Sequence, residues 1–453
     1  MSVATNRYLS GSYAPVADEL TAFDLPVTGT IPAALRGRYL RNGPNPVTPP
    51  DPATYHWFTG TGMVHGIRLA DGRAEWYRNR WVRNAAVADA LGEPEPAGDV
   101  HGGMDGANTN VIGVAGRTFA LVEAGARPVE LSAELETIRR SDFDGTLPNG
   151  FTAHPKVDPV SGELFATAYH WALPGLQYLT LDPAGHVRRC ETISVPGGPM
   201  VHDMSITATR AVLYDLPVIF NLDDAMAGGL FPYSWDDGYG ARIGVLPREG
   251  SDADVRWFEI EPCYVFHPLN AYDDTSGGGD RVVLDVVRYD RMFDRNRLGP
   301  NDGAPALWRW TVDLVAGTVH EVQLDDRAVE FPRVDERVVG RPHRFGFTAS
   351  LRSGQELDFD GTVLVKYDLE RGTTEVHDFG AGHAAGEAVF VPSRPDAAED
   401  DGWVMSLVHD PTTDRSDLVI LAAQDFTGDP VATVHLPQRV PSGFHGNWIP
   451  DPA

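Results

Sequence analysis

The sequence predicts an all-β protein of the β-propeller type. Short stretches of alternating apolar and polar residues recur along the chain, each broken by a turn that contains Gly or Asp. The 453 residues include 47 Gly and 35 Pro without any low-complexity segment, which favours many short strands over long helices. No Pro/Ser-rich linker divides the chain, so we expect one domain over residues 1–453, with residues 1–20 as an N-terminal extension.

Six segments have the pattern of a β-hairpin, in which two alternating strands flank a polar turn. They are residues 63–80, 155–169, 178–193, 307–324, 364–379 and 418–436. Radially repeated sheets explain such an array, because a propeller closes on itself and leaves only short strand edges. A double-sheet sandwich is the alternative, but this chain is too long for a single sandwich.

Two segments interrupt the hairpins. Residues 84–98, NAAVADALGEPEPAG, predict a short helix followed by a loop. Residues 221–240 contain the apolar cluster AMAGGLFPYSW, which has two interpretations of equal weight. It either packs into the core, or it forms a patch that contacts a membrane or lines the route of an apolar substrate.

Bulk composition excludes several classes of protein. The net charge of −27 argues against a nucleic-acid-binding protein, which would carry a basic surface. The two cysteines, Cys190 and Cys263, form no CxxC motif and predict neither a disulfide framework nor a thiolate zinc site. The first residues do not resemble a signal peptide, and no stretch reaches the roughly 18 apolar residues of a membrane span. We therefore expect a cytoplasmic protein.

Four of the fifteen histidines share a distinctive context. His154, His202, His267 and His445 each stand at the predicted mouth of a strand or hairpin, beside Pro, Gly or Asp. Residues that enter the inner strands of a propeller converge on its axis, so four imidazoles from four blades could meet there. Four others, His186, His320, His377 and His435, lie within the predicted hairpins and fit the commoner case of a surface histidine or one with its hydrogen bonds satisfied. The sequence alone does not assign the remaining seven.

Other catalytic motifs are missing from the sequence. It contains no HExxH, no GxSxG and no GxxxxGK[ST]. No histidine is followed two residues later by Asp or Glu, as in the short form of the two-histidine-one-carboxylate iron site. The glycine-rich stretch 60–66 leads into a strand, which is unlike a phosphate-binding loop.

The four histidine contexts resemble the ligand blocks of the carotenoid cleavage oxygenase family. The blocks are TAHPKVDPVSGE (152–163), HDMSIT (202–207), FHPLNAYDD (266–274) and VPSGFHG (440–446), together with RGRYLRNGPNP (36–46) and HWFTGTGMVHG (56–66). This resemblance implies a seven-bladed β-propeller with a dome of loops and helices over the iron face. Family members hold a non-haem Fe(II) with four neutral histidines and use O₂ to cleave an alkene into two carbonyl products.

Carried onto this chain, the resemblance makes His154, His202, His267 and His445 the catalytic iron ligands. It also implies three glutamates that accept hydrogen bonds from ligand imidazoles. Glu123 is expected to orient His202, Glu330 to orient His267, and Glu387 to orient His445. A carboxylate on the far ring nitrogen fixes the tautomer and raises the basicity of the ligand.

Further residues follow from the same resemblance. Thr109 is expected near an open coordination position, and Phe58, Val122, Met200 and Phe266 are candidates for the substrate pocket. Stilbene-cleaving members tend to carry Lys immediately before the first of these glutamates, where it meets a phenolic oxygen. Val122 occupies that position here and cannot make this contact.

The sequence thus predicts an iron(II) dioxygenase that cleaves a carotenoid or apocarotenoid with O₂. Cleavage of stilbenes or phenylpropenoid alkenes by the same site is the first alternative. A propeller that binds a carotenoid without turnover is the second. Residues 225–235 are the candidate for peripheral contact with a membrane, through which an apolar substrate would reach a cytoplasmic enzyme.

Overall fold

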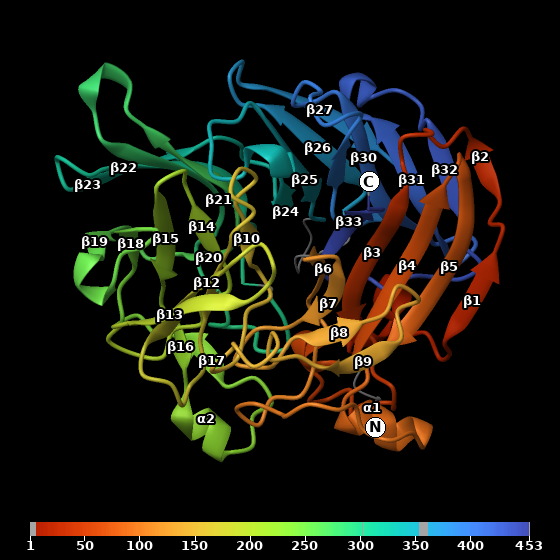
Figure 1. Cartoon of the computed structure of the whole chain (residues 1–453), viewed down its shortest axis with the longest axis horizontal. Helices are drawn as coiled ribbons and strands as arrows, with labels where there is room; N and C mark the ends of the chain where they lie inside the picture. Colours follow the sequence, from red (N-terminus) through yellow and green to blue (C-terminus); the bar gives the residue numbers. More distant parts are fainter. Residues whose placement is uncertain (1–5, 301, 353–360, 453) are drawn as a thin grey trace.

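Seven antiparallel sheets follow one another around a ring (Figure 1). The structure is a computed structural model and describes residues 6–300, 302–352 and 361–452. The colours in Figure 1 run around the ring from red to blue until the last sheet meets the first. The predicted seven-bladed propeller is therefore confirmed.

The seven blades contain nearly all the strands. Blade 1 consists of β1 (Leu20–Phe23), β5 (Arg73–Trp81), β4 (Gly62–Ala70), β3 (Gly37–Pro44) and β33 (Gly446–Pro450). Blade 2 consists of β6 (Asn110–Val114), β7 (Arg117–Leu121), β8 (Val129–Leu131) and β9 (Thr137–Arg140). Blade 3 consists of β10 (Lys156–Val157), β11 (Leu164–Ala168), β12 (Leu176–Leu181) and β13 (Val187–Ile193). Blade 4 consists of β14 (Met204–Ile206), β15 (Arg210–Asp215), β18 (Arg242–Pro247) and β19 (Arg256–Glu259).

The remaining three blades complete the ring. Blade 5 consists of β20 (Tyr264–Asp274), β21 (Arg281–Tyr289), β22 (Ala306–Asp313) and β23 (Thr318–Gln323). Blade 6 consists of β24 (Val329–Arg333), β25 (Phe345–Ser350), β26 (Val363–Asp368) and β27 (Thr373–Asp378). Blade 7 consists of β28 (Ala384–Ala385), β29 (Val389–Pro392), β30 (Gly402–Asp410), β31 (Arg415–Ala422), β32 (Ala432–His435) and β2 (Val27–Gly29).

All six predicted hairpins are confirmed as antiparallel strand pairs. They correspond to β4–β5, β10–β11, β12–β13, β22–β23, β26–β27 and β31–β32. The turn between β4 and β5 shows the local cause: Asp71 and Gly72 both have positive φ, at 51° and 72°. Two such residues form the type of tight turn whose twist matches a hairpin, and Asp-Gly is a favoured sequence for it.

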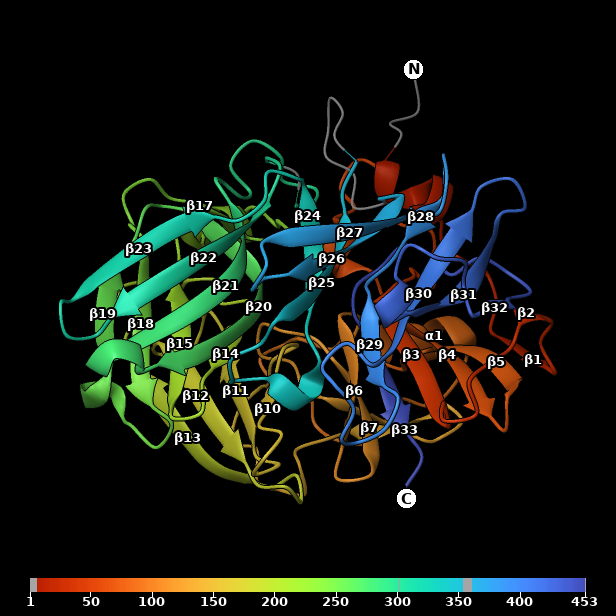
Figure 2. The ribbon, with the colours of Figure 1, turned by 90° about the horizontal axis from the view of Figure 1, so that it is seen from above.

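Both ends of the chain close the ring (Figure 2). The C-terminal strand β33 pairs with β3, from Gly37 opposite Pro450 to Arg41 opposite Gly446. The N-terminal strand β2 pairs with β32 in blade 7. The C-terminal strand thus completes blade 1, and an N-terminal strand completes blade 7. Main-chain hydrogen bonds between the two ends of the chain therefore close the ring.

A few short elements lie outside the blades. They are α1 (Ala85–Leu91), α2 (Leu222–Met226), the pair β16 (Val218–Phe220) and β17 (Tyr233–Trp235), and seven 3₁₀ turns: Arg7–Leu9, Gly11–Tyr13, Trp57–Thr59, Asp252–Asp254, Ser276–Gly278, Glu336–Val338 and Ala423–Asp425. Helix α1 confirms the helix expected within 84–98; the Asn84 side chain caps its start, and Gly92, with φ of 67°, ends it. Both α-helices lie at the lower edge in Figure 1.

The described part of the N-terminal extension is packed against the propeller. Residues 1–5 lie outside the described residues. Tyr8 stacks on Trp57 with ring centroids 5.2 Å apart, and Tyr13 meets the same indole edge-on at 5.3 Å. Both tyrosines are buried, so this segment contributes to the wall behind the central cavity.

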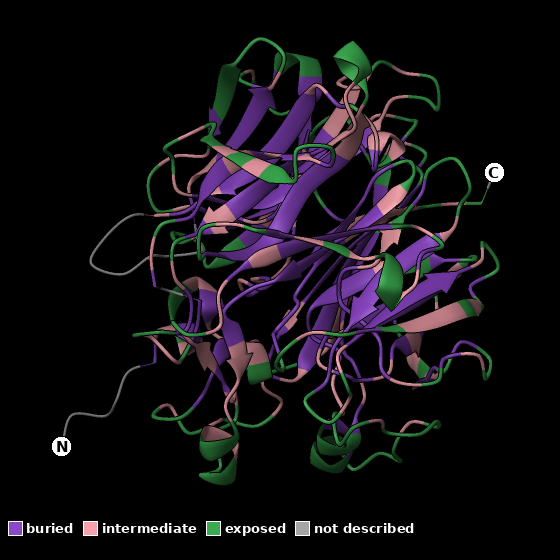
Figure 3. Cartoon of the chain, turned by 90° about the vertical axis from the view of Figure 1, so that its left-hand side faces the viewer, coloured by how far each residue is buried: buried purple, intermediate pink, exposed green. Residues whose placement is uncertain are grey.

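The core lies between adjacent blades and is formed by the inward faces of their strands (Figure 3). Strands are mainly buried and their connections mainly exposed. Helix α2 is different, because none of its residues is buried. Among the helices in the described part of the chain, none is long and apolar enough to span a bilayer.

Candidate metal centre and substrate cavity

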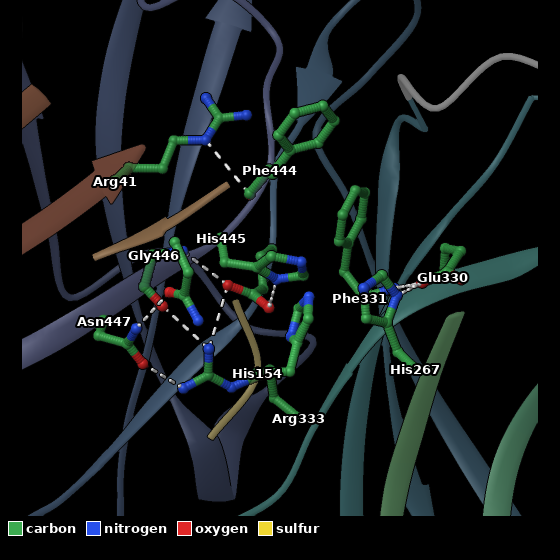
Figure 4. A network of polar contacts seen from close by, with 12 residues as sticks. Arg41, His154, His267, Glu330, Phe331, Arg333, Phe444, His445, Gly446 and Asn447 are labelled. Carbon is green, nitrogen blue, oxygen red and sulfur yellow. Dashed lines mark hydrogen bonds and ion pairs between the residues drawn. The ribbon is translucent and has the colours of Figure 1, made fainter. Parts of the chain in front are cut away.

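Four histidines from four blades meet on the propeller axis. His154 lies just before β10, His202 just before β14 and His445 just before β33, while His267 lies inside β20. One ring nitrogen of each can be chosen so that all four nitrogens lie within 4.8 Å of one another. All four side chains are buried. Figure 4 shows the imidazoles of His154, His267 and His445 turned toward one another.

The position of His267 differs in one respect from the sequence prediction. It was expected at the mouth of a strand, whereas β20 begins at Tyr264 and continues past it to Asp274. The pairing of β20 with β21 shifts register between Val265 and Pro268. Proline has no N–H to donate to the ladder, so an irregularity at this point is expected. The irregularity lies where the imidazole projects toward the axis.

Two of the histidines donate to glutamates from other blades. His202 Nδ1 lies 2.9 Å from both carboxylate oxygens of Glu123, and His267 Nδ1 lies 2.6 Å from Glu330 Oε2. With Nδ1 as the donor, Nε2 is left as the acceptor atom. The two Nε2 atoms are 3.2 Å apart, so their lone pairs point at the same place.

His445 has a third glutamate behind it. Its Nδ1 lies 3.0 Å from Glu387 Oε1, and the Gly446 N–H donates to Oε2 at 2.8 Å. Arg333 Nη1 lies 3.1 Å from the same Oε2. Burial would raise the pKa of Glu387, but Arg333, His445 and the Gly446 amide lower it to about 2. This carboxylate is therefore ionised.

Two tyrosine hydroxyls fix the other glutamates. Tyr169 donates to Glu123 Oε2 at 2.8 Å, and Tyr289 donates to Glu330 Oε1 at 3.0 Å. Burial raises the pKa of both phenols, and the adjacent carboxylates raise it further. Both hydroxyls therefore remain protonated donors.

His154 has no glutamate partner. Its Nδ1 is 3.9 Å from Asp203 Oδ2, and that carboxylate is held by Lys156 Nζ at 2.8 Å. Its Nε2 is buried and has no hydrogen-bond partner. A buried polar atom without a partner costs about 1–3 kcal/mol, which a coordinated cation would remove.

The protonation of three of these histidines suits a cation. Burial, followed by the other three imidazoles, lowers the pKa of His154 far below its ordinary value. Burial also lowers the pKa of His267 and His445. Burial would lower the pKa of His202 too, but Glu123 raises it overall. Neutral imidazoles are metal ligands, so the donor set and the unpartnered nitrogen both fit a metal ion.

A cavity of about 560 Å³ leads to this centre from the side of the ring that carries α2. Three of the predicted pocket residues, Phe58, Val122 and Phe266, line it, as does Thr109. Met200 is placed elsewhere, in the buried core, with its carbonyl accepting from the Tyr264 hydroxyl at 3.0 Å. Three of the four histidines, His202, His267 and His445, form the inner end of the cavity.

Phe331 is a cavity residue that the sequence did not reveal. It follows Glu330 and adopts φ of 53°, which is unusual for a residue with a bulky side chain. Its ring stacks on His267 with centroids 5.8 Å apart and meets His445 edge-on at 5.6 Å. A strained backbone at such a point is typical of functional sites.

Sequence reasoning also missed Tyr169, Tyr289 and Arg333. Tyr169 and Tyr289 lie in ordinary strand or strand-end sequence, while Arg333 lies in the VEFPRV stretch of Glu330. Only the tertiary structure brings the three side chains to the glutamates. The eleven other histidines form no comparable site: within residues 6–300, 302–352 and 361–452, the four axial histidines are the single group of His, Cys, Asp or Glu arranged to hold a metal.

The fold and this site define a class of protein: a seven-bladed propeller with a buried four-histidine centre that can hold a metal ion. The comparisons with known proteins agree. Residues 13–450 match the family model described as retinal pigment epithelial membrane protein. A carotenoid cleavage oxygenase of Mycobacterium tuberculosis is 49% identical, over 98% of this chain and 98% of the relative. The carotenoid 9,10(9′,10′)-cleavage dioxygenase of Crocus sativus is 34% identical, over 98% of this chain and 89% of the relative.

A solved structure gives the same result. The lignostilbene dioxygenase of Pseudomonas brassicacearum superposes with a TM-score of 0.86 at 29% identity, over 99% of this chain and all of the other. The chain therefore belongs to the retinal pigment epithelial membrane protein family, which includes the carotenoid cleavage oxygenases. The predicted family and enzyme class, an oxidoreductase of the cleavage dioxygenase type, are confirmed.

Proposed function

We propose that this protein is an Fe(II)-dependent dioxygenase that cleaves a C=C bond of a carotenoid or apocarotenoid with O₂, giving two carbonyl products. The observation that carries this proposal is the apolar cavity that ends at the histidines. Its volume of about 560 Å³ is within the range of ligand sites, and its wall is largely aromatic and aliphatic. A polyene fits such a wall because it offers apolar surface and no group that needs a hydrogen bond.

We propose that the four histidines are the ligands of Fe(II) and that they therefore form the catalytic centre. All-imidazole sites suit iron among several divalent metals, and a relative is named as a dioxygenase, a reaction for which iron can activate O₂. When bound, Fe(II) supplies the activation of O₂. The chain itself contributes the orientation of the imidazoles through Glu123, Glu330 and Glu387.

The cavity wall determines what the substrate can be. Thr109 and Phe331 both border the inner end, and we propose that Thr109 lies beside an open coordination position. Apolar side chains such as Phe58 and Phe266 exclude water from the reacting bond. The exclusion of water prevents side reactions of reactive species during turnover.

Two observations favour a polyene over a phenolic alkene. Val122 lines the cavity immediately before Glu123, where a phenolate would need a cation. Among the described residues that line the cavity, none is Lys or Arg. The Tyr169 hydroxyl also lines it but already donates to Glu123. Aryl alkenes remain the alternative substrates, because one solved structure of similar fold is a lignostilbene dioxygenase.

The test is to load the protein with Fe(II) under anaerobic conditions, then add air with β-apo-8′-carotenal or resveratrol. We expect two carbonyl products from the apocarotenoid, with one O₂ consumed for each bond cleaved. Faster cleavage of resveratrol would instead establish the aryl-alkene alternative. An iron-loaded protein that cleaves no polyene and no styrene would be a binding protein, and product without O₂ uptake would indicate an isomerase.

Val122→Lys sharpens this assay, with Val122→Leu as the control for size. The lysine variant should cleave resveratrol relatively faster and the apocarotenoid more slowly, because it places a cation where a phenolic oxygen would bind. The leucine variant should keep the preference of the parent. If both variants behave alike, Val122 does not determine the choice of substrate.

We also propose that the protein acts in the cytoplasm and contacts a membrane peripherally through residues 225–235 and the neighbouring apolar side chains. Leu222, Met226 and Leu230 are 61%, 81% and 63% exposed. All three also line the cavity, so apolar surface is continuous from its mouth to its interior. Exposed apolar patches of this kind often mark interaction sites. The two free cysteines suit a reducing compartment.

Liposome flotation tests the membrane contact. Met226→Asp and Leu230→Asp should reduce flotation, while Val315→Asp should not, because Val315 is 81% exposed on a distant turn between β22 and β23. Phe231 is a poor probe, since its ring stacks on His56 at 4.2 Å and a substitution would disturb the cavity wall. A parent protein that does not float would end the membrane proposal.

A further inference from the structure

Arg333 joins three blades beside the metal centre. It is the last residue of β24 in blade 6, and its side chain is 14% exposed. It donates to the Gly446 carbonyl and to Asn447 Oδ1 in β33 of blade 1, each at 2.9 Å. It also lies 3.1 Å from Glu387 Oε2 in blade 7. Figure 4 shows its guanidinium directed at Gly446 and Asn447, next to His445.

The three glutamates behind the ligand imidazoles are therefore not equivalent. Glu123 and Glu330 each accept from a phenol, Tyr169 and Tyr289, which brings no positive charge. Glu387 is the one that contacts a guanidinium. Arginine is always protonated in proteins, so this contact compensates the charge of Glu387. The second carboxylate on the same guanidinium, Glu336, is 62% exposed, so water screens its charge.

When these contacts are added up, two of the three carboxylates around the centre have no positively charged partner. Three carboxylates accept from ligand imidazoles, and one guanidinium contacts one of those carboxylates. The Asp203–Lys156 pair beside His154 adds no net charge. The other buried arginine near this segment, Arg41, has hydrogen bonds to the Pro441 and Phe444 carbonyls, 3.0 and 3.4 Å away. Two negative charges match a divalent ion held by four neutral ligands.

Glu387, Arg333 and the Asp203–Lys156 pair lie on one side of the centre, whereas Glu123 and Glu330 line the apolar cavity. A second cavity, of about 300 Å³, reaches His154, His267 and His445 and is lined by Lys156, Asp203, Arg333, Glu336 and Asn447. None of these five lines the apolar cavity. The guanidinium of Arg333 is thus on the face away from the proposed substrate, where a side chain can change without altering the apolar wall.

We propose that Arg333 is a positioning residue that sets the charge of the metal centre to favour a divalent ion over a trivalent one. The inference rests on the proposed function only in requiring that iron binds. Loss of the Arg333 charge leaves Glu387 uncompensated and adds one negative charge near the ion. Charges interact strongly across a few ångströms of protein interior, so the trivalent state gains more than the divalent state.

The experiment measures the midpoint potential of the Fe(III)/Fe(II) couple in iron-loaded protein without substrate. In Arg333→Met, the ratio of Fe(III) to Fe(II) affinity should rise at least tenfold, which lowers the potential by about 59 mV for one electron. Arg333→Lys keeps the charge and should stay within threefold of the parent. Glu336→Gln is the matched control. Glu336 accepts from the same guanidinium at 2.9 Å, but it is not one of the three glutamates that accept from a ligand imidazole.

A charge cycle with Glu387 completes the test. Glu387→Gln should shift the ratio at least tenfold the opposite way, and the Arg333→Met/Glu387→Gln double variant should return to within threefold of the parent. These two variants carry the test if Arg333→Met alone does not fold. An Arg333→Met potential equal to that of the parent overturns the proposal, as does an Arg333→Lys shift as large as that of Arg333→Met or a double variant that does not return.

The outcome is separable from that of the proposed function. A parent protein that binds no iron would refute the proposed Fe(II) site. A parent that binds iron but cleaves no alkene would refute the proposed reaction, and the potentials of the variants would still decide the role of Arg333.

Discussion

His202 and Glu123 form a hydrogen bond in which one imidazole nitrogen lies 2.9 Å from both carboxylate oxygens, although 79 positions separate the two residues. Glu123 follows the end of β7 in blade 2, and His202 precedes β14 in blade 4. The ring geometry alone brings them together at the axis. The contact fixes which nitrogen of His202 faces the other three histidines, and this makes it the first target for mutation.

Glu123→Gln should weaken metal retention by roughly 10–100-fold, the usual effect of replacing a partner of a ligating histidine. The amide can still accept from Nδ1 but no longer carries the charge that raises the basicity of the ring. Affinity is measured by competition with a chromogenic chelator. Glu136→Gln serves as the control, because Glu136 is an exposed carboxylate paired with Arg80. Equal affinity in all three proteins would remove Glu123 from the metal centre.

Tyr169→Phe should lower both metal affinity and the free energy of unfolding. It removes one of the two donors to Glu123 Oε2 and leaves His202 Nδ1 as the other, and a hydrogen bond to a charged group contributes about 1.5–3 kcal/mol. Chelator competition and urea unfolding measure the two effects. Tyr178→Phe is a matched control, since its hydroxyl donates to the Arg248 carbonyl and not to a carboxylate of the centre. The idea that Tyr169 anchors Glu123 fails if both variants retain metal equally well.

The buried His65 should make the fold less stable as the pH falls. Burial, followed by the charge of Arg41, lowers its pKa to about 3, whereas the unfolded chain has a pKa of roughly 6.5. Between these values the unfolded state binds one more proton than the folded state. The free energy of unfolding therefore falls by about 1.4 kcal/mol for each pH unit of acidification.

His65→Gln tests this by removing one titrating group while leaving a polar side chain near the Tyr77 hydroxyl, 2.9 Å from Nδ1 in the parent. Urea unfolding between pH 4.5 and 6 should show a pH slope smaller by about 1.4 kcal/mol per pH unit than that of the parent. His320→Gln, on the outer strand β23, should keep the parental slope. Parallel slopes for the parent and His65→Gln would show that His65 titrates normally in the folded protein.

Truncation before Val440 should cost metal binding and folding together. It removes His445 and the strand β33, whose pairing with β3 completes blade 1. The full-length variant His445→Ala separates the two effects, because it keeps β33 and loses only the imidazole. We expect the truncated chain to lose its cooperative thermal transition, and His445→Ala to fold but hold little iron. A His445→Ala protein with full iron content and activity would mean that the four-histidine assignment is wrong.

Local sequence determined most of the fold. Alternation and turn residues such as Asp71-Gly72 specify hairpins because they act between neighbours in the chain, and all six predicted hairpins are present. The short helix at α1 was likewise encoded locally, by its Asn84 cap and Gly92. The number of blades and the family followed from the resemblance of the motifs around the four histidines.

The tertiary structure decided what no local pattern carries. Tyr169, Tyr289 and Arg333 acquire a role only because ring closure brings distant blades to one axis, and the sequence neighbourhoods of the two tyrosines are ordinary. Met200 lies near a motif but faces the core, since proximity in sequence does not fix the direction of a side chain. The charge balance of the centre is also a tertiary property, because it depends on which carboxylate meets a guanidinium and which meets a phenol.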